Sequence, residues 1–242
     1  MRIGGRNIAY TLVELLVTIA IIAVLAALLF PAVRGAWVKA LDAKCTGNMR
    51  TLSTGMTSYA ADWGHWPTQN RETPANPEAY GSQPWYFSLM VQNYIPTKRV
   101  TRDGYDCLVS DVLACPANKA NPGARYPWTP APYPWTSSYA INQFWGDTYG
   151  QPLVVPGGAD RVRFPAGINN SSAILLVDCL QGCALYVGND TDWNKASCKI
   201  PRNLHGKGSH ALLANGAVIS ISPDTDPNLP TAQYWDPRYT RP

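Results

Sequence analysis

The first quarter of the chain is dominated by apolar residues. Nineteen residues from Leu15 to Val33 carry no charge, and the stretch extended back to Leu12 spans 22 residues. As a helix it would be about 33 Å long, which matches the hydrocarbon core of a bilayer. A cleaved secretory signal has a shorter apolar core, and a buried helix of a soluble protein is rarely apolar on every face for so long. The pattern favours a membrane-spanning helix.

Beyond Pro31 the apolar residues thin to a stripe on one helical face. They recur every three or four residues, which is the period of one face of an α-helix. Gly64 and Pro67 mark the end of this element. The pattern predicts one helix from about Tyr10 to Asp62, roughly 80 Å long, whose second half packs on a folded body. The stripe consists of Trp37, Leu41, Cys45, Met49, Leu52, Met56, Tyr59 and Trp63.

Short apolar runs broken by Pro, Gly and Asn follow residue 63, and they predict strands. Asn215-Gly216 between the last two runs is a strong signal for a two-residue hairpin turn, because both residues accept positive φ angles. A short helix is expected at Pro84–Asn93, and an extended loop at Tyr126–Trp135. The chain therefore predicts an α+β fold, with a long N-terminal helix packed on a small antiparallel sheet with long loops. The predicted strands are Ala173–Cys179, Ala184–Val187, Ala211–Ala214 and Ala217–Ser222.

Charge is scarce and unevenly placed. Of the 242 residues, 46% are hydrophobic and 15% are charged, and the formal net charge is +4. The whole excess lies in residues 1–50, with six cations and two anions, while residues 51–242 hold fourteen of each sign. Such a body offers no surplus of cations to neutralise phosphates, so nucleic acid is not an expected partner.

One carboxylate, Glu14, stands inside the apolar stretch. An ionised carboxylate in a membrane helix costs about 2.5–3.5 kcal/mol on insertion scales. Two interpretations stay open: the side chain reaches the lipid headgroups, or a cation meets it at that depth. A free α-amino group created by cleavage just upstream would be such a cation.

The segment around this glutamate, Tyr10-Thr11-Leu12-Val13-Glu14-Leu15-Leu16-Val17, resembles the prepilin N-terminal motif shared by type IV pilins and type II secretion pseudopilins. In that family a prepilin peptidase removes a short basic leader and methylates the new N-terminus. The fifth mature residue is glutamate, and a proline often stands at mature position 22. Cleavage between Ala9 and Tyr10 makes Glu14 the fifth residue and Pro31 the twenty-second. The family prefers glycine and phenylalanine where this chain has Ala9 and Tyr10.

The resemblance implies processing at Ala9 and Tyr10 and assembly through Glu14 and Pro31. It divides the chain into a leader (1–9), the transmembrane half of the helix (10–33), its amphipathic half (34–63) and a globular pilin-like body (64–242). It places the helix as a single pass in the inner membrane, with the body in the periplasm or on an extracellular filament. The implied partners are the prepilin peptidase, the inner-membrane assembly platform, and other pilins or pseudopilins in a homo- or hetero-oligomeric filament.

Three body segments are similar to a subgroup of prepilin-like proteins. They are Tyr59–Pro67, Ala114–Pro116 and Ser138–Asn142. The subgroup ends in a histidine, nine further residues and then Asp-Gly. Here His205 is followed by nine residues and Asn215-Gly216, so the spacing is kept but the aspartate is absent.

Six cysteines in a body expected outside the cytoplasm suggest disulfides, for which fifteen pairings exist. Because Cys45 lies on the apolar stripe, we predict that a disulfide joins the helix to the body through Cys45, with Cys115 the best candidate. The alternative is a zinc site, although its Cys-x3-Cys spacing is loose and an oxidising compartment disfavours thiolates. The six cysteines are Cys45, Cys107, Cys115, Cys179, Cys183 and Cys198, and the zinc set is Cys179, Cys183, Cys198, His205 and His210.

Two Asp-x-Asp-x-Asn segments offer clustered oxygen atoms, which suit calcium. The resemblance adds that secretion pseudopilins have a calcium site in their C-terminal loops. Neither segment follows the EF-hand pattern, because Lys195 and Leu229 occupy the glycine position, and such residues also form turns. Calcium is kept as the candidate cofactor, with the ligands Asp190, Asp192, Asn194, Asp224, Asp226 and Asn228.

Motifs for catalysis are absent from the sequence. There is no Gly-x-Ser-x-Gly, and Gly206-Lys207-Gly208-Ser209 lacks the upstream glycine of a phosphate-binding loop. We therefore expect no enzyme, but a structural subunit of a type II secretion pseudopilus or a type IV pilus-like filament. The alternative is a binding module or enzyme outside the cytoplasm on an uncleaved anchor, which would not need Glu14 in register with a cleavage point.

Overall fold

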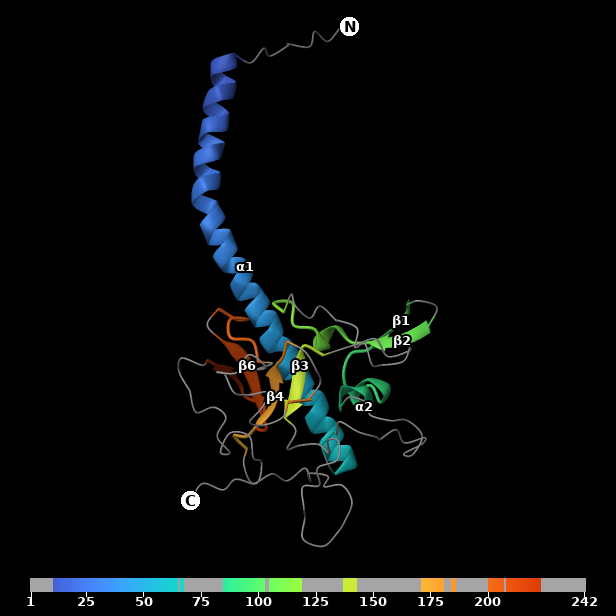
Figure 1. Ribbon diagram of the computed structural model, residues 1–242. Coiled ribbons are helices and arrows are strands. Elements are labelled where there is room, and N and C mark those ends of the chain that lie inside the picture. Colours follow the sequence, from blue (N-terminus) through green and yellow to red (C-terminus); the bar gives the residue numbers. More distant parts are fainter. Residues whose placement is uncertain are drawn as a thin grey trace, which may run out of the picture. The chain divides into compact units, whose positions relative to one another are not determined.

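The computed structural model describes residues 11–64, 66–67, 85–102, 105–118, 137–142, 171–180, 184–185, 200–206 and 208–222 (Figure 1). The chain forms two units, residues 1–40 and residues 41–242. The first contains the N-terminal part of helix α1 (Leu12–Trp63), and the second contains the rest of α1 together with the body.

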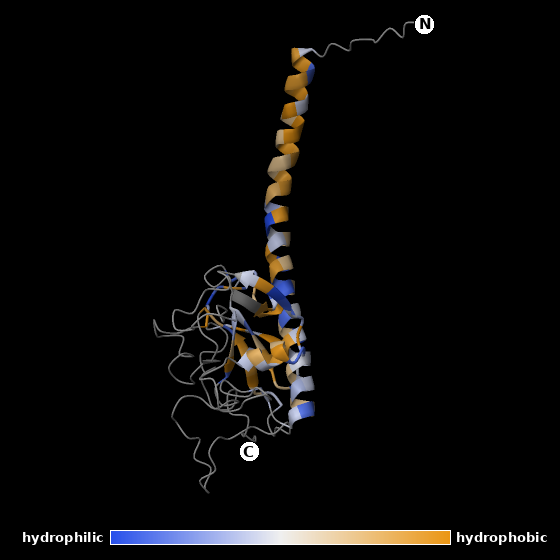
Figure 2. Cartoon of the chain, turned by 90° about the vertical axis from the view of Figure 1, so that its right-hand side faces the viewer, coloured by the Kyte–Doolittle hydropathy of each residue, from blue (hydrophilic) through white to orange (hydrophobic). Residues whose placement is uncertain are grey.

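Helix α1 is 52 residues long and continues without a break through Pro31. In the first unit every residue of this helix is exposed, and Figure 2 shows that most of the residues there are hydrophobic. Within the described part of the chain, α1 is the one helix that is long and apolar enough to cross a membrane. The predicted long helix from Tyr10 to Asp62 is confirmed to within two residues at its start and one at its end.

In the second unit α1 buries one face, but this face is shorter than predicted. Trp37 is 67% exposed and lies in the first unit, and Trp63 is 40% exposed. The Trp63 indole N–H donates to Gln92 Oε1 at 2.8 Å, so this ring meets a polar partner at the end of the helix. The prediction that both tryptophans belong to the core face is therefore wrong. The buried residues of α1 are Cys45, Asn48, Met49, Leu52, Gly55, Met56, Tyr59 and Ala60.

The body contains a five-stranded sheet in the order β5-β3-β4-β6-β7. Each neighbouring pair among β3, β4, β6 and β7 is antiparallel, as predicted. Strand β5 departs from the prediction, because it pairs in parallel with β3 at the edge. Strand β5 follows β4 in the chain and runs in the opposite direction to it. Because β3 also runs opposite to β4, β5 and β3 run in the same direction. The strands are β3 (Tyr139–Asn142), β4 (Ile174–Asp178), β5 (Ala184–Leu185), β6 (Ser209–Leu213) and β7 (Val218–Ile221).

Strand β4 is buried on both faces, which explains its uninterrupted apolar sequence. On one face Leu175 and Leu176 join the core formed with α1, and on the other face Ile174 and Val177 join a second cluster. Adjacent leucines face the same way because the ladder to β6 is irregular between Ile174 and Leu176. The sheet therefore carries buried apolar side chains on both of its faces.

The turn between β6 and β7 has three residues, not the predicted two. Leu213 N–H donates to the Ala217 carbonyl at 2.8 Å and Gly216 N–H donates to the Leu213 carbonyl at 2.9 Å, so residues 214–216 form the loop. Gly216 has φ +84°, whereas Asn215 does not have a positive φ. The Asn215 side chain instead accepts the Ala217 N–H at 3.0 Å. The hairpin itself is confirmed.

Four smaller elements complete the described body. Helix α2 (Trp85–Val91) confirms the helix predicted at Pro84–Asn93 and is buried over its first six residues. Strands β1 (Lys98–Arg102) and β2 (Tyr105–Val109) form a separate antiparallel pair that was not predicted, followed by the short 3-10 helix η1 (Asp111–Leu113).

Candidate functional site

The start of α1 is held by a reciprocal pair of side chains, Thr11 and Glu14. The Thr11 backbone N–H donates to Glu14 Oε2 at 2.8 Å, and the Thr11 hydroxyl donates to the same oxygen at 2.9 Å. In return, the Glu14 N–H donates to Thr11 Oγ1 at 3.2 Å. This arrangement is a capping box, in which two backbone N–H groups of the first helical turn find partners.

The capping box gives Glu14 a local role that sequence reasoning missed. The signal was available, because Thr-x-x-Glu before an apolar run is the usual sequence of a capping box. The carboxylate lies at the N-terminal end of the helix dipole, which also favours a negative charge.

Pro31, the second predicted assembly residue, lies in the exposed, uninterrupted part of α1. Ala9 and Tyr10, the predicted cleavage pair, lie outside the described residues.

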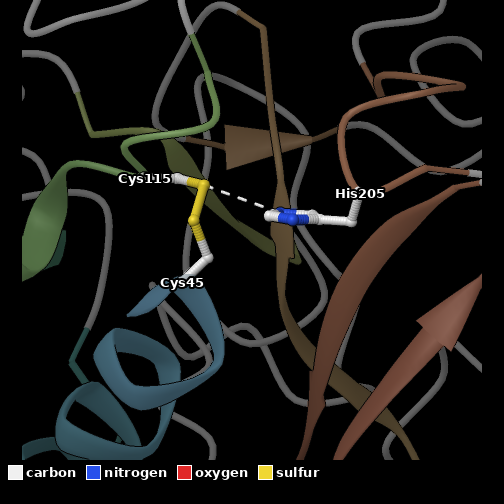
Figure 3. A group of neighbouring side chains, drawn as sticks. All are labelled: Cys45, Cys115 and His205. Carbon is white, nitrogen blue, oxygen red and sulfur yellow. Dashed lines mark hydrogen bonds between the residues drawn. A yellow bond between two sulfur atoms is a disulfide. The ribbon is translucent and has the colours of Figure 1, made fainter. Parts of the chain in front are cut away.

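The second unit joins its helix to the body by a disulfide between Cys45 and Cys115, as predicted (Figure 3). The Cα atoms are 5.1 Å apart and the residues are 70 positions apart in sequence. One helical turn further, Asn48 Nδ2 donates to the Ala114 carbonyl at 2.9 Å. The segment around Cys115 is thus fixed to α1 by one covalent bond and one buried hydrogen bond.

Beside this disulfide lies a group of four ionisable side chains, here called the His-Asp cluster: Asp42, Asp178, His205 and His210. The side chains of Asp178 and the two histidines are buried, whereas that of Asp42 is partly exposed. Strand alternation places Asp178 on the same face of β4 as Leu176, and His210 on the same face of β6 as Leu212, which is the face toward α1. The ladder pairs Val177 with Ala211, so the side chains of the next residues on this edge are neighbours.

His205 reaches the cluster from the turn before β6, and Asp42 reaches it from α1. Asp42 is one turn before Cys45 on the same helical face, because residues three apart lie above one another. His205 Nε2 is 3.5 Å from Cys115 Sγ (Figure 3). The disulfide and the His-Asp cluster are therefore adjacent parts of one contact between helix and body.

Distances within the His-Asp cluster are short. Asp42 Oδ1 is 3.1 Å from His205 Nδ1 and 3.1 Å from His210 Nε2. On the other side of the rings, Asp178 Oδ2 is 3.2 Å from His205 Nε2 and 3.8 Å from His210 Nδ1. The imidazole rings lie 4.0 Å apart at 31°. Asp178 is fully buried and accepts the His210 backbone N–H at 2.6 Å.

The surroundings shift the protonation of two groups here. Burial lowers the pKa of the His210 imidazole, and the nearby His205 lowers it further, while Asp178 and Asp42 act in the opposite direction. Burial, followed by the charge of Asp178, raises the pKa of Tyr139 far above its ordinary range. Tyr139 pairs with Asp178 across β3 and β4, so it too lines this end of the sheet.

The predicted zinc set is only partly brought together. His205 and His210 are in contact, as that set requires, but their neighbours are carboxylates. Cys179 belongs to the core cluster on the opposite face of the sheet, because it follows Asp178 and strand residues alternate. Its inclusion in the set is therefore wrong. Cys183 and Cys198 lie outside the described residues.

For the remaining predicted site residues the structure describes no side chain. Cys107 is on β2, but its side chain is not described. Both calcium segments lie outside the described residues, and their ligands would be Asp190, Asp192, Asn194, Asp224, Asp226 and Asn228.

Comparison with known families identifies one match, which covers residues 6–30. The matching family model is the prokaryotic N-terminal methylation motif. No curated protein and no solved structure matches the chain. The chain thus carries the N-terminal motif of type IV pilins and pseudopilins, and this motif implies processing by prepilin peptidase and assembly into filaments in general terms. One exposed apolar helix with this motif is consistent with a single-pass anchor in the inner membrane.

Proposed function

We propose that this chain is a structural subunit of a helical filament, either a type II secretion pseudopilus or a type IV pilus-like fibre. The observation that carries the proposal is the position of Glu14. It stands at the start of a long exposed apolar helix, inside the segment that matches the methylation motif. Prepilin peptidase would cleave between Ala9 and Tyr10 and methylate the new amine of Tyr10.

The exposed apolar surface of α1 supports assembly through this helix. From Leu12 to Val33 all side chains are exposed in the single chain. Such a surface needs lipid around it or other apolar helices against it. The helix can occupy the bilayer before assembly, and the core of a helix bundle after it. The bodies would then form the filament surface, in the periplasm or outside the cell.

Glu14 would set the register between subunits. The capping box gives the carboxylate two hydrogen bonds, and the helix dipole contributes roughly 0.3–1 kcal/mol, which does not cover the cost of a charge in lipid. A charge-assisted bond to the Tyr10 amine of a neighbouring subunit would make up the difference. Unprocessed subunits lack this amine, so pairing would also select cleaved chains.

The body supports a structural role. Its helix α1 is held to the segment around Cys115 by the Cys45–Cys115 disulfide, which suits a part exposed to stress outside the cytoplasm. The resemblance to the prepilin-like subgroup adds to this proposal, since His205 and Asn215-Gly216 keep the subgroup's spacing. We propose no catalytic activity for the body.

Three substitutions test the proposal, because they separate the charge of Glu14 from its capping role. A capping box accepts glutamine as well as glutamate, so Glu14→Gln keeps the cap and removes the charge. This variant should insert and be cleaved normally, yet give no filaments. Glu14→Asp should retain partial filament formation. The measurement is the yield of sheared filaments beside the abundance of each variant in the membrane fraction.

Thr11→Val is the matched control, because it removes the capping hydroxyl and leaves the charge in place. It should cost about 1 kcal/mol at the helix start and leave filament yield close to that of the wild type. Normal filament yield from Glu14→Gln would contradict the proposal. If Thr11→Val gives no filaments while Glu14→Gln gives a normal yield, the role of Glu14 is capping of the helix and not pairing between subunits.

A further inference from the structure

Three ligand atoms of the His-Asp cluster converge on one point between α1 and the sheet. They are Asp42 Oδ1, His205 Nδ1 and His210 Nε2, and all lie within 4.8 Å of one another. The carboxylate oxygen is 3.1 Å from each nitrogen. Ligand atoms around a tetrahedral zinc ion, with bonds of about 2.0–2.1 Å, are separated by about 3.3–3.4 Å. The two oxygen–nitrogen distances are close to this value, and the two nitrogens lie within 4.8 Å of each other, so one ion could reach all three atoms after a small adjustment.

Hydrogen bonding among the described residues does not account for this arrangement. Asp42 Oδ1 is buried and accepts no hydrogen bond from the described residues, although two imidazole nitrogens lie 3.1 Å away. His210 Nδ1 is likewise buried without a hydrogen-bond partner among them. Buried polar atoms in native proteins nearly always have partners, and leaving one without a partner costs free energy. A cation at the convergence point would satisfy the carboxylate oxygen.

On the side of the imidazole rings away from Asp42 lies a second carboxylate, which is the usual partner of a metal-bound histidine. A histidine that binds a metal through one nitrogen usually donates its other N–H to a carboxylate. Asp178 Oδ2 occupies this position, 3.2 Å from His205 Nε2, and the His210 backbone N–H holds the carboxylate in place. The cluster thus places a carboxylate on each side of the two imidazoles, a grouping of negative charge that a cation would offset.

We propose that Asp42, His205 and His210 bind one divalent transition-metal ion, with Asp178 as the outer carboxylate that orients His205. Two imidazoles and one carboxylate form a donor set suited to Zn²⁺ and Fe²⁺, whereas Ca²⁺ takes oxygen ligands. The rings are tilted by 31° with centroids 4.0 Å apart, and each presents one nitrogen 3.1 Å from Asp42 Oδ1, so the two nitrogens face the same side. The Asp42 side chain is 45% exposed, which leaves an entry path and room for a water ligand.

The neighbouring sulfur atoms are not ligands of this site. Cys115 Sγ lies 3.5 Å from His205 Nε2, but it is bonded to Cys45. Metal ligation requires the thiolate, which a disulfide does not provide. The ion instead joins α1 to the sheet through Asp42 and the two histidines, one helical turn from the covalent link. This role is independent of Glu14 and of filament assembly.

The test uses the full chain in detergent, treated with a chelator and dialysed, with Zn²⁺ as the probe. Isothermal titration should show one equivalent bound, and saturating Zn²⁺ should raise the melting temperature, because it binds only the folded chain. Asp42→Asn and His210→Gln should each abolish stoichiometric binding and the thermal shift. Asp178→Asn should weaken binding 10–100-fold, which is typical for loss of an outer carboxylate. Millimolar Ca²⁺ should not compete.

Controls distinguish the site from adventitious binding. His65→Gln removes the remaining histidine of the chain and should still bind one equivalent with unchanged affinity. An intact Cys45–Cys115 disulfide, checked by peptide mapping, shows that each variant has folded. Co²⁺ should bind with the visible absorption of a four-coordinate site with nitrogen ligands. The proposal is overturned if the wild type binds no Zn²⁺ at micromolar concentration, or if folded Asp42→Asn binds as tightly as the wild type.

Discussion

Removing the disulfide between α1 and the body should strongly destabilise the second unit. The bond closes a loop of 70 residues, since Cys45 and Cys115 are that far apart in the sequence. A loop of this length restricts the unfolded chain by about 4 kcal/mol at 25 °C in the chain-entropy account. Typical folded domains have a net stability of about 5–15 kcal/mol, so this contribution is a large share of the total.

The two sulfur atoms also fill space in the core. Cys45 has no exposed surface and Cys115 only 2%, and both belong to the cluster that contains Met49 and Leu52. Replacing both cysteines by alanine keeps the apolar character and removes one heavy atom from each side chain. The loss of packing therefore adds to the effect of the lost restriction on the unfolded chain. The double variant should lose about 3–5 kcal/mol of unfolding free energy.

The assay is equilibrium unfolding in urea, in detergent and without reductant, followed by tryptophan fluorescence. Trp85 is fully buried and reports on the body. Thr54→Ala, on the exposed side of α1, is the matched control and should change the free energy of unfolding by less than about 0.5 kcal/mol. A double cysteine variant within about 1 kcal/mol of the wild type would refute the argument from loop length.

Two pairs of substitutions test the packing of α1. A Cβ on Gly55 would lie 2.7 Å from Ile95 Cγ2 and 2.8 Å from the Tyr94 carbonyl oxygen, so Gly55→Ala should cost about 1–3 kcal/mol in urea unfolding. Gly47→Ala meets nothing within 4 Å and should instead stabilise the helix by up to about 1 kcal/mol; the opposite order would contradict this packing. Leu52→Ala should lower the free energy of unfolding by about 2–5 kcal/mol, while Trp37→Ala, at an exposed position, should leave it within about 0.5 kcal/mol; equal effects would contradict the shortened core face.

Sequence pattern predicted the elements whose signals are local. The uninterrupted apolar run predicted the membrane-type helix, and the spacing of its later apolar residues predicted the buried face around Met49 and Leu52. Asn215-Gly216 correctly placed the last hairpin, because a glycine with positive φ marks a turn whatever surrounds it. Its length was misjudged because the Asn215 side chain bonds to Ala217 and extends the loop.

Strands that depend on distant partners were missed. Strand β3 is only four residues long, and it is stabilised by β4 and β5, which lie more than thirty positions later. Strands β1 and β2 had a local signal in Asp103-Gly104 between two short runs, but β1 carries charges at both ends and neither strand alternates cleanly between apolar and polar residues. Short strands without a clear alternation are the elements that pattern identifies least well.

The His-Asp cluster could be predicted only in part. His205 and His210 are five residues apart and were grouped correctly, but Asp42 and Asp178 come from a helix and a strand far away in sequence. One signal was present: Asp178 ends a fully apolar run, and a carboxylate buried in a central strand needs a partner. Strand alternation then excludes Cys179, which sequence reasoning had included.

The central claim, that the chain is processed as a prepilin, is tested most directly by the mass of its mature N-terminus. The protein should be extracted from membranes of cells with an active prepilin peptidase and its N-terminal peptide analysed by mass spectrometry. The account predicts a chain that begins at Tyr10 and carries one N-methyl group, and a chain that begins at Met1 when the peptidase is deleted. An intact Met1 in cells with the active peptidase would contradict the claim and leave α1 as a simple anchor.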